Sequence, residues 1–291
     1  MMKFFLIRNL LRITSLIPFW IMYGLSDMTA FILNHVVRYR RKVILDNLFL
    51  CFPDKTINEL KKTRRAFYRH FCDIFLEAVK LQTISKKNLL KRIVIKNPEL
   101  FDTYFNDNKS IILYSAHFGN WEYLAALPFY TKHQLLTFYH PQTNTFINDM
   151  VRGVRERFGI IAYPSESGFK AMSEYNRNQI PTLTLMLGDQ RPKIKSSIEN
   201  VVFFNQETAF LVGPDRIAKK LNQVLVYPHY EKVRRGFYTI ELRVIEENPK
   251  QVDGAEIIEC FASNLEASIR KSPHMWLWSH RRWKKVNRWV A

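Results

Sequence analysis

The stretch Ser110-Ile-Ile-Leu-Tyr-Ser-Ala-His117-Phe-Gly-Asn-Trp-Glu122 is an apolar run that ends in a histidine, a glycine turn and a carboxylate. Its row of β-formers predicts a short buried strand at 111–114, and its Gly-Asn pair predicts a turn before a helix. His117 is therefore expected at the end of a strand, where open α/β sheets place their binding sites.

The acid of this stretch suggests a chemical role for the histidine. Glu122 follows His117 by five residues and is expected in the first turn of the next helix, where its carboxylate can accept a hydrogen bond from one ring nitrogen. The other nitrogen is then left to take a proton, which is the base-and-orienter arrangement of acyl-transfer enzymes. The backbone N–H groups of Gly119 and Asn120 are candidates for an oxyanion site. A surface histidine beside a helix-capping acid has the same spacing, so the pair alone leaves both interpretations open.

The composition is that of a folded chain with a strongly basic surface. The chain has 291 residues, 47% hydrophobic residues and a formal net charge of +18. Such a charge suits nucleic acid, an anionic membrane or a phosphorylated substrate, and the aromatic content of 14% favours the membrane. Three widely spaced cysteines predict neither a zinc site nor a disulfide framework and fit a reducing compartment. We expect no metal ion and no cofactor.

Residues 1–42 predict a membrane anchor. Within Ile13 to Val37 the only charged residue is Asp27. At about 1.5 Å per residue, a helix of that length could cross a bilayer core of roughly 30 Å. Pro18 and Asp27 interrupt this segment, so it either spans the bilayer or lies in its interface, and a pair of buried core helices is the structural alternative. More basic residues follow the segment than precede it, which places the rest of the chain in the cytoplasm.

The remainder, 43–291, is expected to form one domain. Residues 43–90 predict a helical hairpin, with a capping box of Thr56 and Glu59 opening a helix over 57–81. From 91 to 291 strands and helices alternate, which predicts a mostly parallel central sheet flanked by helices. Strands are expected at 93–95, 111–114, 135–139, 181–187, 224–230 and 238–246, and further helices at 146–158, 209–221 and 251–271.

Further polar residues are candidates for substrate binding. Asp189 follows the strand at 181–187 just as His117 follows its own strand, so the two are expected to share one cleft. Arg157 lies on the predicted helix at 146–158. Thr208 precedes the predicted helix at 209–221, whose N-terminus could hold an anion, although a connecting loop with a capped helix explains it equally well.

The C-terminal segment 272–284 combines tryptophans with basic residues. It contains Arg281 and Arg282, candidates for binding a phosphate group. An aromatic and cationic strip of this kind suits lipid headgroups and the membrane interface, and an RNA-binding tail has a similar composition. The structural alternative is a tail that packs across the catalytic domain, with its arginines paired to acids.

Separated motifs in this order resemble the bacterial lipid A late acyltransferases, within the His-x4-Asp/Glu glycerolipid acyltransferase superfamily. They are YRRKVILDNLFLCFPD at 39–54, AHFGNWE at 116–122, Asp-Gln at 189–190 and WLWSHRRWK at 276–284. Asn205 stands where the family usually has glycine, and His274-Met275 replaces its usual acid-Gln pair.

This resemblance implies a fold similar to glycerol-3-phosphate acyltransferase and transfer of a fatty acyl chain from acyl carrier protein or acyl-coenzyme A to a hydroxyl of a lipid A precursor. It implies His117 as general base, Glu122 as its orienter, and an enzyme at the inner membrane whose catalytic domain faces the cytoplasm and contacts anionic lipid, not nucleic acid. No nucleophile elbow surrounds His117, so direct transfer is expected rather than an acyl-enzyme on Ser115. Another acceptor, such as an aminolipid or a glycolipid, and a non-catalytic basic binder remain alternatives.

Overall fold

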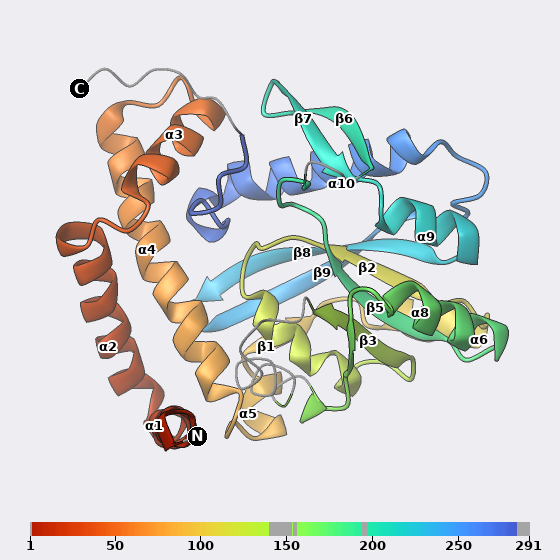
Figure 1. Cartoon of the computed structure of the whole chain (residues 1–291), viewed down its shortest axis with the longest axis horizontal. Helices are drawn as coiled ribbons and strands as arrows, with labels where there is room; N and C mark the ends of the chain where they lie inside the picture. The colour runs from red at the N-terminus through yellow and green to blue at the C-terminus, as the bar shows by residue number, and fades with distance from the viewer. Residues whose placement is uncertain (1, 140–152, 154–155, 194–196, 284–291) are drawn as a thin grey trace.

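The structure is a computed structural model that describes residues 2–139, 153, 156–193 and 197–283 (Figure 1). Its centre is a seven-stranded sheet with the strand order β1-β9-β8-β2-β5-β3-β4. Strands β8, β2, β5, β3 and β4 run parallel, whereas β9 is antiparallel to β8 and β1 is parallel to β9. This sheet with its flanking helices confirms the predicted mixed α/β class.

The strands of the sheet follow the predicted runs of β-formers, with one addition, β4. Their bounds are β1 Ile93–Ile95, β2 Ile111–Ser115, β3 Gln134–Tyr139, β4 Ile161–Pro164, β5 Thr182–Leu187, β8 Val224–Arg234 and β9 Phe237–Glu246. Every residue of β2 is buried. That burial explains its continuous apolar run, because a parallel strand covered on both faces has no solvent-facing side.

A separate hairpin corrects one predicted helix. Residues β6 Ile198–Phe203 and β7 Gln206–Leu211 pair antiparallel, and the helix α9 covers only Pro214–Leu221. The predicted helix at 209–221 is therefore wrong in its first part. Thr208-Ala-Phe-Leu continues a β-pattern, and the helix starts only at the proline, whose fixed φ suits a first helical turn.

Helices cover both faces of the sheet. On one face lie α8 Gly168–Arg177, α9 and α10 Gly254–Lys271, and on the other lie α5 Lys86–Leu90 and the 3-10 segment η2 Trp121–Phe129. The short helix α6 Glu99–Asn106 precedes β2. The sequence did not predict α6 or α8, and the helix predicted at 146–158 lies mostly outside the described residues.

The N-terminal helices form a group beside the sheet, with α4 nearest to the strands (Figure 1). The chain runs through α1 Met2–Leu16, α2 Phe19–Phe31, the π-helical turn η1 Ile32–Val36, α3 Arg41–Cys51 and α4 Ile57–Lys80. The capping box of Thr56 and Glu59 at the start of α4 is present as predicted.

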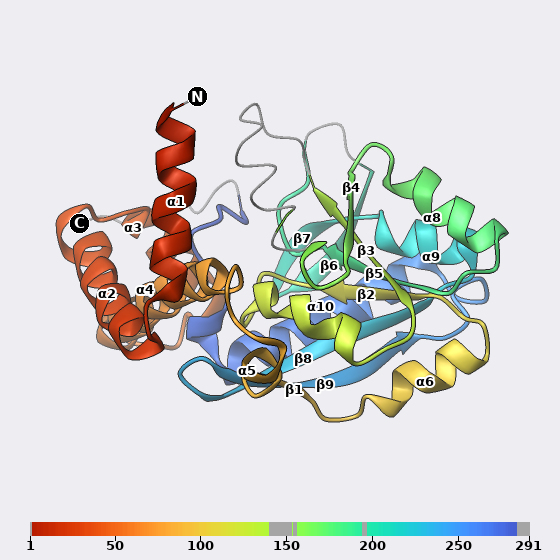
Figure 2. The same ribbon diagram turned by 90° about the horizontal axis from the view of Figure 1, so that it is seen from below.

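The apolar N-terminal segment breaks at Pro18, where α1 turns away from α2 (Figure 2). Within the described residues, no helix is by itself both long enough and apolar enough to cross a bilayer. The helical pieces Asn9–Leu16 and Phe19–Val36 satisfy these requirements together, but they are bent by 119° at their junction.

Ion pairs join α2 to α4 and to the turn between β8 and β9. Asp27 lies 2.9 Å from Arg235, in the turn between β8 and β9, and 2.7 Å from Arg69 on α4. The same Arg235 lies 2.6 Å from the buried Asp73 of α4. The acid that interrupts the apolar segment therefore faces the protein, and α2 is fixed to α4 and to the β8–β9 turn.

Candidate active site

The sheet register brings His117 and Asp189 together. Strands β2 and β5 pair parallel with Ser115 opposite Leu187, so the residues two positions further on, His117 and Asp189, lie side by side at the carboxyl edge. His117 Nδ1 is 2.8 Å from Asp189 Oδ1. Gly188 permits this approach, because a Cβ there would lie only 2.2 Å from the Tyr114 ring.

Asp189 is a buried carboxylate with a second fixed partner. Its Oδ2 accepts a hydrogen bond of 2.8 Å from the indole N–H of Trp276. Burial raises the pKa of Asp189, but the facing His117 and the hydrogen bonds from His117 and Trp276 outweigh it and hold the pKa below its ordinary value. An ionised Asp189 fixes the tautomer with the proton on Nδ1 of His117, which leaves a lone pair on Nε2.

The carboxylate that contacts His117 Nδ1 is Asp189, whereas the sequence pattern indicated Glu122. Glu122 lies in the first turn of η2 and accepts a hydrogen bond of 3.0 Å from the indole of Trp121. The ring of Trp121 packs edge-on against His117, with centroids 5.2 Å apart. The spacing pattern considers only neighbours along the chain. Asp189, the partner of His117, lies 72 positions further along the sequence.

The turn after His117 has a conformation that requires glycine. Gly119 has φ +67°, and a Cβ on it would lie 2.7 Å from the Tyr230 ring, so glycine is required here. The backbone N–H of Gly119 donates to Met275 O at 3.1 Å, so this donor, which we expected to face an oxyanion, is already bonded. The side-chain oxygen of Asn120 accepts from the backbone N–H groups of Glu122 and Tyr123 and caps η2.

The C-terminal segment completes the site. Phe118 and Trp276 form an isolated antiparallel bridge, and the backbone N–H of Leu277 donates to His117 O at 3.1 Å. The backbone N–H of Arg191 donates to His280 Nε2 at 3.0 Å, which ties the loop after Asp189 to the same segment. Sequence reasoning singled out this tail by its tryptophans and basic residues and by resemblance, but it gave Trp276 and His280 no role in positioning.

A cavity of about 670 Å³ opens beside His117. Most of its lining is apolar, as expected of a site for a hydrocarbon chain. Glu122, Gln190, Arg191 and Lys193 add polar groups to it, and the Gln190 amide nitrogen lies 3.3 Å from His117 Nε2. The apolar lining includes Leu124, Phe138, Ile160, Phe169, Leu185 and Ile217. Among the described residues, no group of three or more side chains is placed to hold a metal ion.

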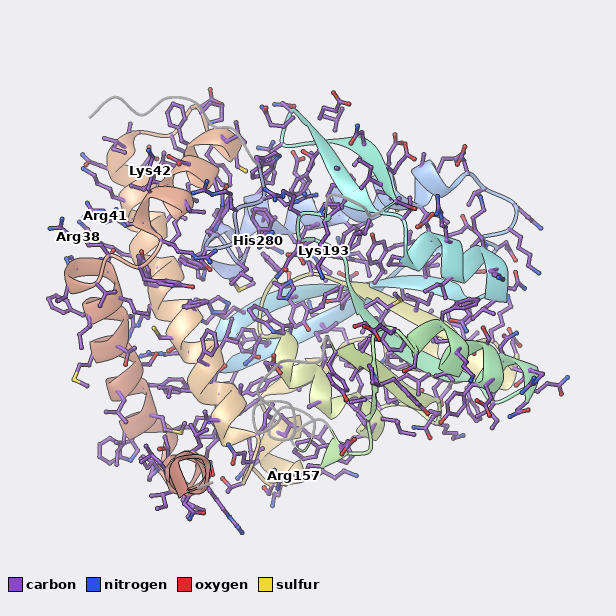
Figure 3. The ribbon with its side chains drawn as sticks, in the orientation of Figure 1. Arg38, Arg41, Lys42, Arg157, Lys193 and His280 are labelled. Atoms are coloured by element: carbon purple, nitrogen blue, oxygen red, sulfur yellow. The ribbon has the colours of Figure 1, made fainter. Side chains whose placement is uncertain are left out.

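Two of the candidate substrate-binding residues bond to the protein itself. Arg157 donates to the backbone carbonyls of Leu81 and Ile84, and Figure 3 places it apart from Lys193 and His280. Thr208 is buried, donates to Gln206 O and accepts from the indole of Trp283, each at 2.9 Å. These contacts favour a structural role for Arg157 and Thr208 over contact with substrate.

The two neighbouring arginines of the tail differ. Arg281 is exposed, whereas Arg282 is only 2% exposed and donates to Ala209 O at 2.6 Å. Its guanidinium lies 4.5 Å from the centroid of the Phe210 ring. Burial lowers the pKa of Arg282 to about 10, and the charge of Asp189 opposes that shift. Arg282 therefore packs against the domain as the structural alternative expected, but it bonds to a backbone carbonyl rather than to the expected acid. Arg281 is the arginine of this pair that faces solvent.

This difference predicts separate effects for the two arginines. Arg282→Lys should destabilise the protein by about 1–3 kcal/mol, because lysine cannot keep both the carbonyl bond and the ring contact. Differential scanning calorimetry should show a lower Tm with KM unaltered, and Arg281→Lys is the matched control with an unchanged Tm. An unchanged Tm in Arg282→Lys would contradict the packing role.

The fold and the site together define an α/β enzyme with a histidine–aspartate pair beside an apolar cavity. The family described as bacterial lipid A biosynthesis acyltransferase matches residues 1–285, and the chain belongs to this family. It is therefore an acyltransferase that acts in lipid A biosynthesis, with an acyl donor and an acceptor of the lipid A type. A search of the curated proteins gave no match to the chain.

Proposed function

We propose that the protein transfers a fatty acyl chain from an acyl thioester, on acyl carrier protein or coenzyme A, to a hydroxyl of a lipid A precursor, with His117 as general base. The observation that carries this proposal is the 2.8 Å contact between His117 Nδ1 and the buried Asp189 carboxylate, at the side of the apolar cavity. A base with a fixed tautomer and an apolar cavity for the chain are two of the requirements of direct acyl transfer.

In the proposed reaction one proton is transferred, a carbon–oxygen bond forms and a carbon–sulfur bond breaks. His117 Nε2 takes the proton of the acceptor hydroxyl while the oxygen attacks the thioester carbonyl. The carbon–sulfur bond then breaks, and the proton on Nε2 passes to the departing thiolate. Asp189 stays ionised and stabilises the imidazolium between these steps.

Gln190 is our candidate donor for the oxyanion, in place of Gly119. Its amide nitrogen lies within hydrogen-bond distance of His117 Nε2, at 3.3 Å, and can donate to the thioester oxygen once the acceptor hydroxyl takes its place at Nε2. Arg191 and Lys193 line the same cavity and can meet phosphate groups of donor or acceptor. Glu122 lines the same cavity, and we propose that it contacts the acceptor rather than orients the base.

The direct test incubates the purified protein with an acyl thioester and an underacylated lipid A precursor. Mass spectrometry should show a precursor heavier by one acyl chain, with wild-type protein and not with His117→Ala. Acylation of an aminolipid or a glycolipid, but not of the precursor, would support the alternative acceptor. Lipids from cells lacking the gene should show the corresponding missing chain.

We also propose that residues 1–42 attach the catalytic domain, 43–291, to the cytoplasmic face of the inner membrane by lying in the interface. The buried side of α2 contains Met22, Ser26 and Ala30, whereas apolar residues at helical spacing face outward. Trp20, Met28 and Phe31 on this outer side of α2 are 76%, 56% and 60% exposed. Arg38, Arg41 and Lys42 follow α2 along the chain and lie among the N-terminal helices (Figure 3), and they suit anionic headgroups.

This arrangement predicts how the protein leaves the membrane. Replacing Trp20, Met28 and Phe31 together by glutamate should leave the fold intact, because these side chains point outward, and should allow high salt to release the protein from vesicles with anionic lipid. Each nearby cation adds only about 1 kcal/mol of binding, which salt screens.

The matched control replaces exposed apolar residues elsewhere, Ile198, Val202 and Val233, by glutamate. Vesicle sedimentation at low and high salt should show this control variant bound as tightly as wild type. Release of both variants to the same extent would contradict the proposed interfacial role of α2.

A further inference from the structure

We infer that Glu77 and His70 of α4 are positioning residues for the catalytic turn: they hold Asn120 and Gly119 from behind and thereby place His117. This inference rests on the proposed function, since it concerns the geometry of the proposed base. Neither residue belongs to a motif in the sequence, and neither touches the cavity that would receive substrate.

The contact between Glu77 and Asn120 fixes the turn through a side-chain amide of known orientation. The Asn120 oxygen accepts backbone N–H groups at 3.1 and 3.2 Å, so its NH2 group must point the other way. There it donates to Glu77 Oε2 at 2.5 Å. Both side chains are buried, Asn120 at 0% and Glu77 at 1% exposure, so this charge-assisted bond is protected from water.

His70 holds the preceding residue of the turn. Its Nε2 lies 3.2 Å from Gly119 O. Burial lowers the pKa of His70 well below its ordinary value, so the ring is neutral, and only an Nε2–H tautomer can bond to a carbonyl. Gly119 is thus held by His70 through its carbonyl and by Met275 through its N–H. The turn has little freedom to move between α4 and the tail.

The same carboxylate extends the contact to the N-terminal helices. The hydroxyl of Tyr23 on α2 donates to Glu77 Oε1 at 2.7 Å, and Arg92 donates to that hydroxyl at 3.2 Å. Burial raises the pKa of Glu77 to about 7 and the nearby Asp73 adds to the shift, while Tyr23, Lys232 and Asn120 oppose it. Since a buried carboxylate requires such partners, Glu77 ties α2, α4 and the catalytic turn into one unit.

The test exchanges the donor and the acceptor of the hydrogen bond between Glu77 and Asn120. Asn120→Asp keeps the cap of η2 but sets two carboxyl groups face to face, which displaces the turn. We expect kcat of acyl transfer to fall about 10- to 100-fold with KM unaltered, because misplacing reacting groups by about 1 Å has effects up to about 10². Adding Glu77→Gln restores a donor–acceptor pair with the original total charge, and kcat should return to within about threefold of wild type.

Tm is measured for all variants, and Glu247→Gln, which alters a carboxylate bonded to Tyr104 away from the turn, is the matched control with unchanged kcat. A lower Tm with unchanged kcat in Asn120→Asp would overturn the inference. If Asn120→Asp does not fold, the double variant with Glu77→Gln decides. A double variant that folds but is inactive would overturn the inference, and one that folds and is active would support it. Wild-type protein no more active than His117→Ala would instead reject the proposed function itself.

Discussion

Replacing His117 by alanine is expected to lower kcat of acyl transfer by a factor of about 10²–10⁴, the usual contribution of a positioned general base. The side chain lies at the cavity wall, so the variant should still fold, but Tm should fall because the buried Asp189 carboxylate loses its facing partner. Single-turnover measurement with a labelled acyl thioester reports the chemical step directly.

The exposed His35→Ala is the matched control and should transfer acyl chains at the wild-type rate. Glu122→Ala should retain more activity than His117→Ala, because Glu122 lines the cavity and does not hold the tautomer. Wild-type turnover by His117→Ala would mean that another group removes the proton, and the mechanism proposed above would be wrong.

The second large effect is expected for Asp189→Asn, which keeps the shape of the side chain. An asparagine oxygen that accepts from Trp276 turns its NH2 group toward Nδ1 of His117. The imidazole must then place its proton on Nε2, and this tautomer cannot act as a base. In serine proteases the corresponding change costs about 10⁴ in kcat, and we expect a loss of about 10²–10⁴ here.

The tautomer itself can be observed. Nitrogen-15 NMR of labelled imidazole should show the proton on Nδ1 in wild-type protein and on Nε2 in Asp189→Asn. The exposed Asp54→Asn is the control for the loss of one negative charge. An unchanged tautomer together with full activity would remove Asp189 from the mechanism.

Much of the fold could be predicted because its signals are local. A run of apolar β-formers predicted β2, and the capping box predicted the start of α4. The strands expected at 224–230 and 238–246 are present as β8 and β9. The predictions failed where the pattern was short or ambiguous: β7 and the start of α9 share one apolar stretch, and their boundary is set by pairing with β6.

Only the local features of the candidate site could be predicted from the sequence. His117 and Asp189 could both be placed at strand ends, but the hydrogen bond between them depends on β2 and β5 being neighbours in the sheet, which no local pattern specifies. The contributions of Glu77, His70 and Trp276 arise from contacts between distant segments. Arginine is a residue type that commonly binds phosphate, so the sequence alone suggested that role for Arg282. Only the burial of its side chain reveals the packing role.

The contacts of Met275, Trp276 and Leu277 with the catalytic turn bear on when the protein becomes active during its synthesis. Ribosomes add about 5–20 residues per second from the N-terminus, so β2 and β5 emerge seconds before these three residues. Until then Asp189 lacks its indole partner, and the turn lacks both backbone contacts that the tail supplies. A chain cut before residue 275 is therefore expected to keep the histidine, the aspartate and most of the cavity wall without the order needed for transfer, so that incomplete translation products do not modify lipid.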